Sequence, residues 1–196
     1  MAPTGWFTPR SFTNTASSPT TITTAMGCRI TDMRLFSPTF YYRGVTDIDL
    51  EELRDADIDT LLIDIDNTIL PRDTGEMVEE LSEWSKALLG HGFKVCLVSN
   101  NWHAHVKRIA DSLGMCMVPR ALKPLPFGFR QAVRLLGSDR RKTAVIGDQM
   151  FTDILGGNLL GMTTVLVLPL SESDLPHTLM LRRIERWIMA KRRPLP

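Results

Sequence analysis

The segment LLIDIDNTIL, residues 61–70, joins an apolar run to two carboxylates, Asp64 and Asp66, which stand two positions apart. In an extended strand, residues i and i+2 point to the same side, so the two acids are expected to share one small space. Such a pair is costly to bury unless a cation, a hydrogen-bond network or a difference in protonation relieves the repulsion. The segment therefore predicts a buried strand that ends in a functional site.

Four more apolar runs follow, and helix-like segments separate them. The strand-like runs, the first included, are rich in β-branched residues and cover 60–66, 94–100, 115–119, 142–148 and 163–169. The intervening segments carry apolar residues near helical spacing and close on glycine, and they cover 76–92, 103–114, 126–137 and 151–161. This alternation predicts a doubly wound α/β fold, with a mostly parallel sheet and helices on both faces.

Polar residues follow four of these predicted strands. In such folds, ligands bind beyond the carboxyl ends of the strands, and the polar residues expected to meet at that edge are Asp64, Asp66, Thr68, Ser99, Asn100, Lys123, Asp148 and Asp153. Carboxylates, an ammonium group and a hydroxyl suit a divalent metal ion and a phosphate group. Structural alternatives exist, since the paired acids could cap the strand, Lys123 could be a solvated turn residue and Asp153 could stabilise a helix start.

The motifs DIDNT, SN, KP and GDQMFTD, which begin at residues 64, 99, 123 and 147, occur in a specific order and spacing. They resemble the four motifs of the haloacid dehalogenase (HAD) superfamily of phosphohydrolases. Roughly residues 33–190 are further similar to the YqeG-type group, whose characterised relatives dephosphorylate phosphatidylglycerophosphate. The resemblance implies a HAD-like, Rossmann-like sheet and a phosphomonoester hydrolase that works through an aspartyl-phosphate, most specifically on phosphatidylglycerophosphate.

The same resemblance implies a role for each matched residue. Asp64 is the expected nucleophile and Asp66 the expected general acid and base. The expected cofactor is Mg²⁺, with Asp64, Asp148 and the backbone carbonyl of Asp66 as its ligands. Asp153 is expected to orient the metal ligands or Lys123. The residues expected to contact substrate or phosphate are Thr68, Ser99, Asn100 and Lys123.

The intervals between the motifs leave no room for a cap domain. Many HAD relatives insert such a domain after the first motif or between the second and third, where it closes over a small molecule. Here the intervals 64–99 and 99–123 each hold about one helix, or one helix and one strand. The open site is therefore expected either to be covered by a second subunit in a homo-oligomer or to act on a large or surface-bound substrate, such as a lipid headgroup.

The two ends of the chain differ in composition from the middle. Residues 1–32, which open with an acid-free stretch rich in Thr, Ser and Pro, are predicted to be a disordered extension, with an organellar transit peptide as the alternative. The biological start could also be Met26 or Met33. Residues 33–178 are the predicted phosphatase domain. Residues 179–196 are predicted to form a basic amphipathic helix and tail, which either packs on the domain or lies on an anionic membrane.

Composition bounds the class of protein. A chain of 196 residues with 43% hydrophobic and 23% charged residues is typical of one soluble domain. A formal charge of +1 gives no general attraction to nucleic acid, and no nucleic-acid partner is expected. No apolar run is long enough to span a bilayer, and no signal peptide is recognised. The three cysteines are expected to be buried free thiols in a reducing cytoplasm.

The expected function is thus Mg²⁺-dependent phosphomonoester hydrolysis in the cytoplasm, with peripheral membrane contact if the C-terminal helix binds lipid. The first alternative is the same chemistry on a soluble sugar, nucleotide or phosphoprotein. The second is a non-catalytic protein that binds phosphate or RNA. Because Asp64 and Asp66 fill the positions that catalysis needs, the sequence disfavours the second alternative.

Overall fold

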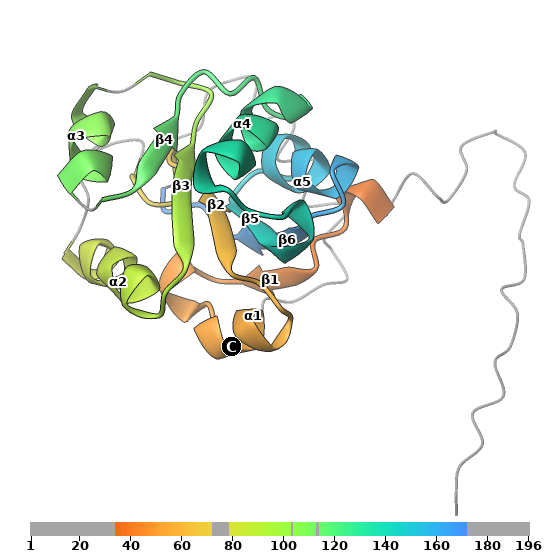
Figure 1. Cartoon of the computed structure of the whole chain (residues 1–196), viewed down its shortest axis with the longest axis horizontal. Coiled ribbons are helices and arrows are strands. Elements are labelled where there is room, and N and C mark those ends of the chain that lie inside the picture. Colours follow the sequence, from red (N-terminus) through yellow and green to blue (C-terminus); the bar gives the residue numbers. More distant parts are fainter. Residues whose placement is uncertain (1–33, 72–78, 103, 113, 172–196) are drawn as a thin grey trace, which may run out of the picture.

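The computed structural model describes residues 34–71 and 79–171, apart from residues 103 and 113. Within these residues lies a six-stranded sheet with the strand order β1-β6-β5-β2-β3-β4 (Figure 1). The predicted extension 1–32 and the predicted C-terminal helix and tail, residues 179–196, lie outside the described residues.

Every neighbouring pair of strands in the sheet is parallel. The central pair, β2 (Thr60–Ile63) and β5 (Thr143–Gly147), is buried along its whole length. The outer strands are β3 (Lys94–Val98) and β4 (Cys116–Val118) on one side, and β6 (Thr163–Val167) and β1 (Phe40–Tyr42) on the other. All six carboxyl ends therefore meet at one edge of the sheet, as the alternating pattern predicts.

Helices cover both faces of this sheet (Figure 1). On one face lie α1 (Leu50–Asp55) and α2 (Glu79–Gly90), which pack against Leu61 and Ile63 of β2 in one apolar core. On the other lies α4 (Pro126–Leu136), whose Phe129 packs with Leu62 in a second core. The two cores follow from the alternation of side chains along a strand. The doubly wound α/β fold is thereby confirmed.

Five further short elements lie in the connections. Helix α3 (Ala104–Ser112) links β3 to β4, and α5 (Leu155–Leu159) follows a π-helical turn, η4 (Met150–Ile154). The turns η2 (Val45–Asp47) and η3 (Arg140–Lys142) are 3₁₀-helical. Among the described helices, none has both the length and the apolar character that crossing a membrane requires.

Two elements, β1 and α1, were not among the predicted ones. Strand β1 has three residues, and its pairing with β6 brings Phe40 opposite Val165. Helix α1 begins after Asp49, whose carboxylate accepts hydrogen bonds from the backbone N–H groups of Glu51 and Glu52. Such a cap satisfies donors that the first turn leaves unpaired. Both elements are shorter than the window over which periodicity can be recognised.

The expectation of free thiols is wrong for two of the cysteines. Cys96 and Cys116 form a disulfide in the structure. They occupy paired positions on the neighbouring strands β3 and β4, and their Cα atoms lie 4.6 Å apart. Because this proximity arises from strand register, their separation of 20 residues along the chain gave no sign of it. Cys28 lies outside the described residues.

Candidate active site

Two aspartates lie directly beyond the central strands. Asp64 follows β2 and Asp148 follows β5, and both side chains are buried. The backbone N–H of Asp64 donates to the carbonyl oxygen of Ile146 at 2.9 Å, which extends the β2–β5 pairing by one bond. The sheet thus fixes the backbone position of Asp64 independently of the contacts of its side chain.

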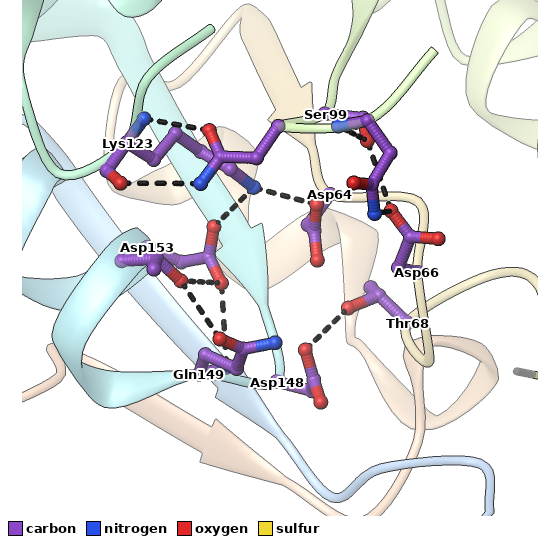
Figure 2. A network of polar contacts seen from close by, with 11 residues as sticks. Asp64, Asp66, Thr68, Ser99, Lys123, Asp148, Gln149 and Asp153 are labelled. Carbon is purple, nitrogen blue, oxygen red and sulfur yellow. Dashed lines mark hydrogen bonds and ion pairs between the residues drawn. The ribbon is translucent and has the colours of Figure 1, made fainter. Parts of the chain in front are cut away.

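Lys123 reaches into this acidic group from the loop between β4 and α4. Its Nζ atom lies 2.5 Å from Asp64 Oδ1 and 2.6 Å from Asp153 Oδ1, and Figure 2 shows the lysine between the two carboxylates. All three side chains are buried. Asp153 comes from η4 and lies against Gly147, where an added Cβ would stand 2.3 Å from the Asp153 Cγ atom. Glycine at 147 therefore makes room for the acid.

Burial and charge act in opposite directions on the ion-paired groups. Burial raises the pKa of Asp64 well above its usual range, the Lys123 charge lowers it, and the charges of Asp153 and Asp148 raise it. Burial alone would lower the pKa of Lys123, but the attraction of Asp153 and Asp64 outweighs burial and raises that pKa. Two of the three clustered carboxylates, Asp64 and Asp153, pair with Lys123, so the cluster holds more acidic groups than this one ammonium group can neutralise, which favours a further cation.

The acidic group offers a suitable set of ligands for that cation. Asp64, Asp148 and Asp153 each present an oxygen atom, and these atoms lie within 4.8 Å of one another. Oxygen donors alone suit a hard divalent ion. The hydroxyl of Thr68 donates to Asp148 Oδ1 at 3.3 Å, a contact that orients one of the ligands. Asp153 is therefore a candidate ligand as well as the partner of Lys123.

The side chain of Asp66 faces a different set of partners. Its Oδ2 atom accepts hydrogen bonds from the Ser99 hydroxyl at 2.9 Å and from the Asn101 side-chain amide at 3.0 Å. The backbone N–H of Asn101 also donates to the Ser99 oxygen, at 3.0 Å. The loop after β3 therefore holds the carboxylate of Asp66 in place, on the opposite side of Asp64 from Lys123 and Asp153 (Figure 2).

Asn100, predicted to contact phosphate, binds the backbone of Lys123 with its side chain. Its amide donates to the Lys123 carbonyl oxygen at 3.1 Å and accepts from the Lys123 backbone N–H at 2.7 Å. These two hydrogen bonds join the loop after β3 to the loop after β4. The side chain of Asn100 therefore positions the lysine, while its predicted contact with substrate remains a prediction.

The structure adds residues that were not predicted as part of the site. Asn101 binds Asp66, and the Thr152 hydroxyl donates to Asp153 Oδ2 at 3.1 Å. Asn67 adopts a left-handed φ of 68°. Its side chain exchanges hydrogen bonds of 2.9 Å with the backbone of Ser171, 104 residues away. Asparagine is among the residues that tolerate this conformation. The asparagine of the DIDNT motif could therefore have indicated a left-handed turn at this position.

Comparison with known proteins identifies the family. The "Probable phosphatase YqeG" of Bacillus subtilis (strain 168) is 35% identical over 157 residues, which cover 80% of this chain and 91% of that protein. The chain is a YqeG-type phosphatase of the HAD superfamily. A family described as HAD-hydrolase-like matches residues 121–172 of this YqeG-type phosphatase, a stretch that contains Lys123, Asp148 and Asp153.

Solved structures with a related fold are more distant from this YqeG-type phosphatase. The cobalt-bound deoxy-D-mannose-octulosonate 8-phosphate phosphatase of Haemophilus influenzae is 14% identical, with a TM-score of 0.48 over 69% of this chain and 89% of that one. The 3-deoxy-D-manno-octulosonate 8-phosphate phosphatase of Moraxella catarrhalis, in complex with magnesium, phosphate and KDO, is 13% identical, with a TM-score of 0.45 over 72% and 92%.

Proposed function

We propose that this YqeG-type phosphatase is Mg²⁺-dependent and hydrolyses phosphatidylglycerophosphate to phosphatidylglycerol and inorganic phosphate. The observation that carries the proposed chemistry is the buried contact of Lys123 with Asp64 and Asp153, beside Asp148. It combines a carboxylate nucleophile, a fixed positive charge and oxygen ligands in one place. A site for binding phosphate without reaction would not need two carboxylates beside that phosphate.

The reaction assigned to these residues has two steps. An oxygen of Asp64 attacks phosphorus, and the bond from phosphorus to the glycerol oxygen breaks while the aspartyl-phosphate forms. Asp66 donates a proton to the departing glycerol oxygen and then accepts one from a water molecule that attacks phosphorus. The bond from phosphorus to the Asp64 oxygen then breaks, which releases phosphate and restores the Asp64 carboxylate. Ser99 and Asn101 hold the Asp66 carboxylate in one orientation, as both steps require.

Positive charge must balance the phosphoryl group as it binds. Lys123 supplies one charge at the Asp64 oxygen, and its ammonium group has three N–H donors to divide among two carboxylates and a phosphoryl oxygen. Asp64, Asp148 and either Asp153 or the Asp66 carbonyl would hold Mg²⁺, which when bound reduces the repulsion between the nucleophile and an anionic substrate. The Ser99 hydroxyl has one proton, which it donates to Asp66 in the structure, so the predicted bond to a phosphoryl oxygen would require this hydroxyl to rotate when substrate binds.

The choice of a lipid substrate rests on the open site and on the family resemblance. Helix α2 is the described element between β2 and β3, and α3 is the described element between β3 and β4. Neither forms a cap over Asp64. An open site admits a phosphate group that projects from a large surface. A soluble phosphomonoester remains the second candidate, since the same residues would serve it.

The test measures phosphate release from phosphatidylglycerophosphate in mixed micelles, beside a panel of soluble phosphomonoesters, with Mg²⁺ or with a chelator. Wild type is compared with Asp64→Asn and with the surface variant Asp55→Asn. Lipid hydrolysis that needs both Mg²⁺ and Asp64 supports the proposal. Hydrolysis of soluble esters alone would remove the lipid substrate and keep the chemistry. Absence of hydrolysis on every substrate would favour the non-catalytic alternative.

A further inference from the structure

Large apolar side chains are exposed in the loops around the active site. Trp102, Leu122, Leu125 and Phe127 each expose between 50% and 64% of their surface. Trp102 lies in the loop between β3 and α3, and the other three lie between the end of β4 and the first turn of α4. Because the strands are parallel, both loops lie at the carboxyl edge of the sheet. This is the edge that carries Asp64 and Lys123.

The two loops are joined to each other and to the site. Asn100, two residues before Trp102, makes both of its described side-chain hydrogen bonds with Lys123, which stands between Leu122 and Leu125 in the chain. On the other side of the central strands, Leu168 and Leu170 follow β6 and are also exposed. The Leu170 N–H donates to the carbonyl oxygen of Asn67, next to Asp66. Apolar residues therefore flank the site on two sides.

Scattered exposed leucines are ordinary on protein surfaces, so the distribution matters more than the number. Among the described residues, nine large apolar side chains are exposed, and six of them are Trp102, Leu122, Leu125, Phe127, Leu168 and Leu170. We call these six residues the rim surface. In addition, Leu122 has a left-handed φ of 58°, an uncommon conformation for a bulky residue, directly beside Lys123. Strained backbone of this kind is concentrated at functional sites.

Charge distinguishes between the occupants that this surface could have. Arg43 and Arg120 are exposed at the same edge, after β1 and β4 respectively. The Arg43 carbonyl oxygen accepts from the N–H of Leu168, which ties this arginine to the rim surface. A second copy docked symmetrically would bring a like-charged patch against these arginines. An anionic lipid surface complements both the cations and the apolar side chains, and tryptophan is favoured at such interfaces.

We propose that the rim surface docks on an anionic lipid bilayer and holds the mouth of the active site against the headgroups. This inference deepens the proposed function and rests on it, because the docking would serve to bring a lipid phosphate to the active site. Trp102 and Phe127 enter the interface beside the leucines, while Arg43 and Arg120 contact anionic headgroups. Asp64 stays buried behind them, so that a phosphate projecting from the bilayer is presented to the nucleophile without a cap domain.

The experiment measures co-sedimentation of the full chain with vesicles of phosphatidylcholine and phosphatidylglycerol in a ratio of about 7 to 3, which supply the anionic charge. Wild type is compared with the double variant Trp102→Ser, Phe127→Ser. The matched control is Leu135→Ser, Leu159→Ser, since these leucines are equally exposed but lie at the ends of α4 and α5, toward the opposite edge. Thermal melts establish that all three proteins are folded.

The double variant is expected to bind vesicles at least about tenfold more weakly than wild type, and the control to bind like wild type. Hydrolysis of the soluble ester para-nitrophenyl phosphate is expected to be unchanged in both, because none of the four substituted residues is placed in the catalytic machinery. Equal vesicle binding by wild type and the double variant would overturn the inference, as would absence of binding by wild type. A dimer of wild type that the double variant loses, with vesicle binding intact, would assign the surface to a second copy.

The outcomes also separate this inference from the proposed substrate. Vesicle binding through the rim surface without hydrolysis of phosphatidylglycerophosphate would retain the docking and refute the substrate. Hydrolysis of that lipid in detergent, together with a wild type that ignores vesicles, would retain the substrate and refute the docking. Residues 179–196 are present in every variant, so binding through that basic segment alone would appear as equal binding by all of them.

Discussion

The ammonium group of Lys123 lies 2.6 Å from a carboxylate oxygen of Asp153, although the two residues come from different connections of the sheet. The lysine follows β4, and the aspartate lies in the turn after β5. Together with Asp64, they form a buried ionic group whose members depend on one another. Removal of one member leaves the others as unpaired charges, which is the expensive outcome for a buried pair.

Replacement of Lys123 by Met is therefore expected to lower the free energy of unfolding by about 3–5 kcal/mol in the presence of a chelator. The matched control is Lys142→Met, because Lys142 pairs with Asp57 at 2.8 Å on the surface. Exposed pairs contribute about 0–1 kcal/mol. Urea denaturation of both variants measures the difference. Similar losses in the two variants would contradict the assignment of Lys123 to a buried ionic group.

Gly147 is expected to tolerate no side chain. In Gly147→Ala, the new methyl group would stand 2.3 Å from the Asp153 Cγ atom, so the acid must move away from Lys123. We expect a loss of about 1–3 kcal/mol in stability, together with a clear fall in kcat. Gly90→Ala is the control, because nothing lies within 4 Å of its added Cβ. A fully active Gly147→Ala enzyme would show that the placement of Asp153 is not required.

Divalent metal is expected to stabilise the protein through the acidic cluster. A ligand that binds the native state alone adds about 2.7 kcal/mol at a hundred times its Kd, so Mg²⁺ should raise Tm. Asp148→Asn removes one of the three candidate ligands and is expected to abolish most of this rise. Asp55→Asn, an exposed acid of α1, should retain it. If Asp148→Asn kept the full rise in Tm, the metal would have to bind elsewhere.

Asn100 is expected to act through Lys123 and not on the substrate itself. Asn100→Ala removes two hydrogen bonds to the Lys123 backbone, of 2.7 and 3.1 Å, and leaves these backbone groups of a buried residue without those partners. The expected loss is about 1–3 kcal/mol in stability, with a decrease in kcat that exceeds any change in KM. Steady-state kinetics on a soluble ester measures the changes in kcat and in KM separately. An increase in KM alone would instead support the predicted contact between Asn100 and phosphate.

The sequence predicted the position of a functional residue well where that residue directly follows a strand. Asp64 and Asp148 are recognisable because each follows a fully apolar run, and parallel pairing then brings the two acids together. Asp153 was expected near Lys123 or the metal, and the structure places it 2.6 Å from Lys123. These placements depend on the general geometry of parallel sheets and therefore survive errors of a few residues in the predicted strand ends.

Features that depend on three-dimensional proximity could not be predicted from the sequence. The disulfide between Cys96 and Cys116 follows from the register of β3 and β4, which no local pattern encodes. The side-chain contact of Asn100 with Lys123 likewise spans 23 residues. Strand β1 is too short to show a period, and it is stabilised as a strand by its neighbour β6. In each case, tertiary contacts decide what the local sequence leaves open.

The pairing of β1 with β6 has a consequence for the order of events during synthesis. Thr39 and Thr164, joined by hydrogen bonds at this edge, are 125 residues apart. Because the chain is synthesised from its N-terminus, β1 emerges early from the ribosome. It cannot pair with β6 until nearly all of the described domain has emerged. Until then, Phe40 and Tyr42 cannot pack into the core as they do in the folded domain. Both side chains would be accessible to chaperones on the nascent chain.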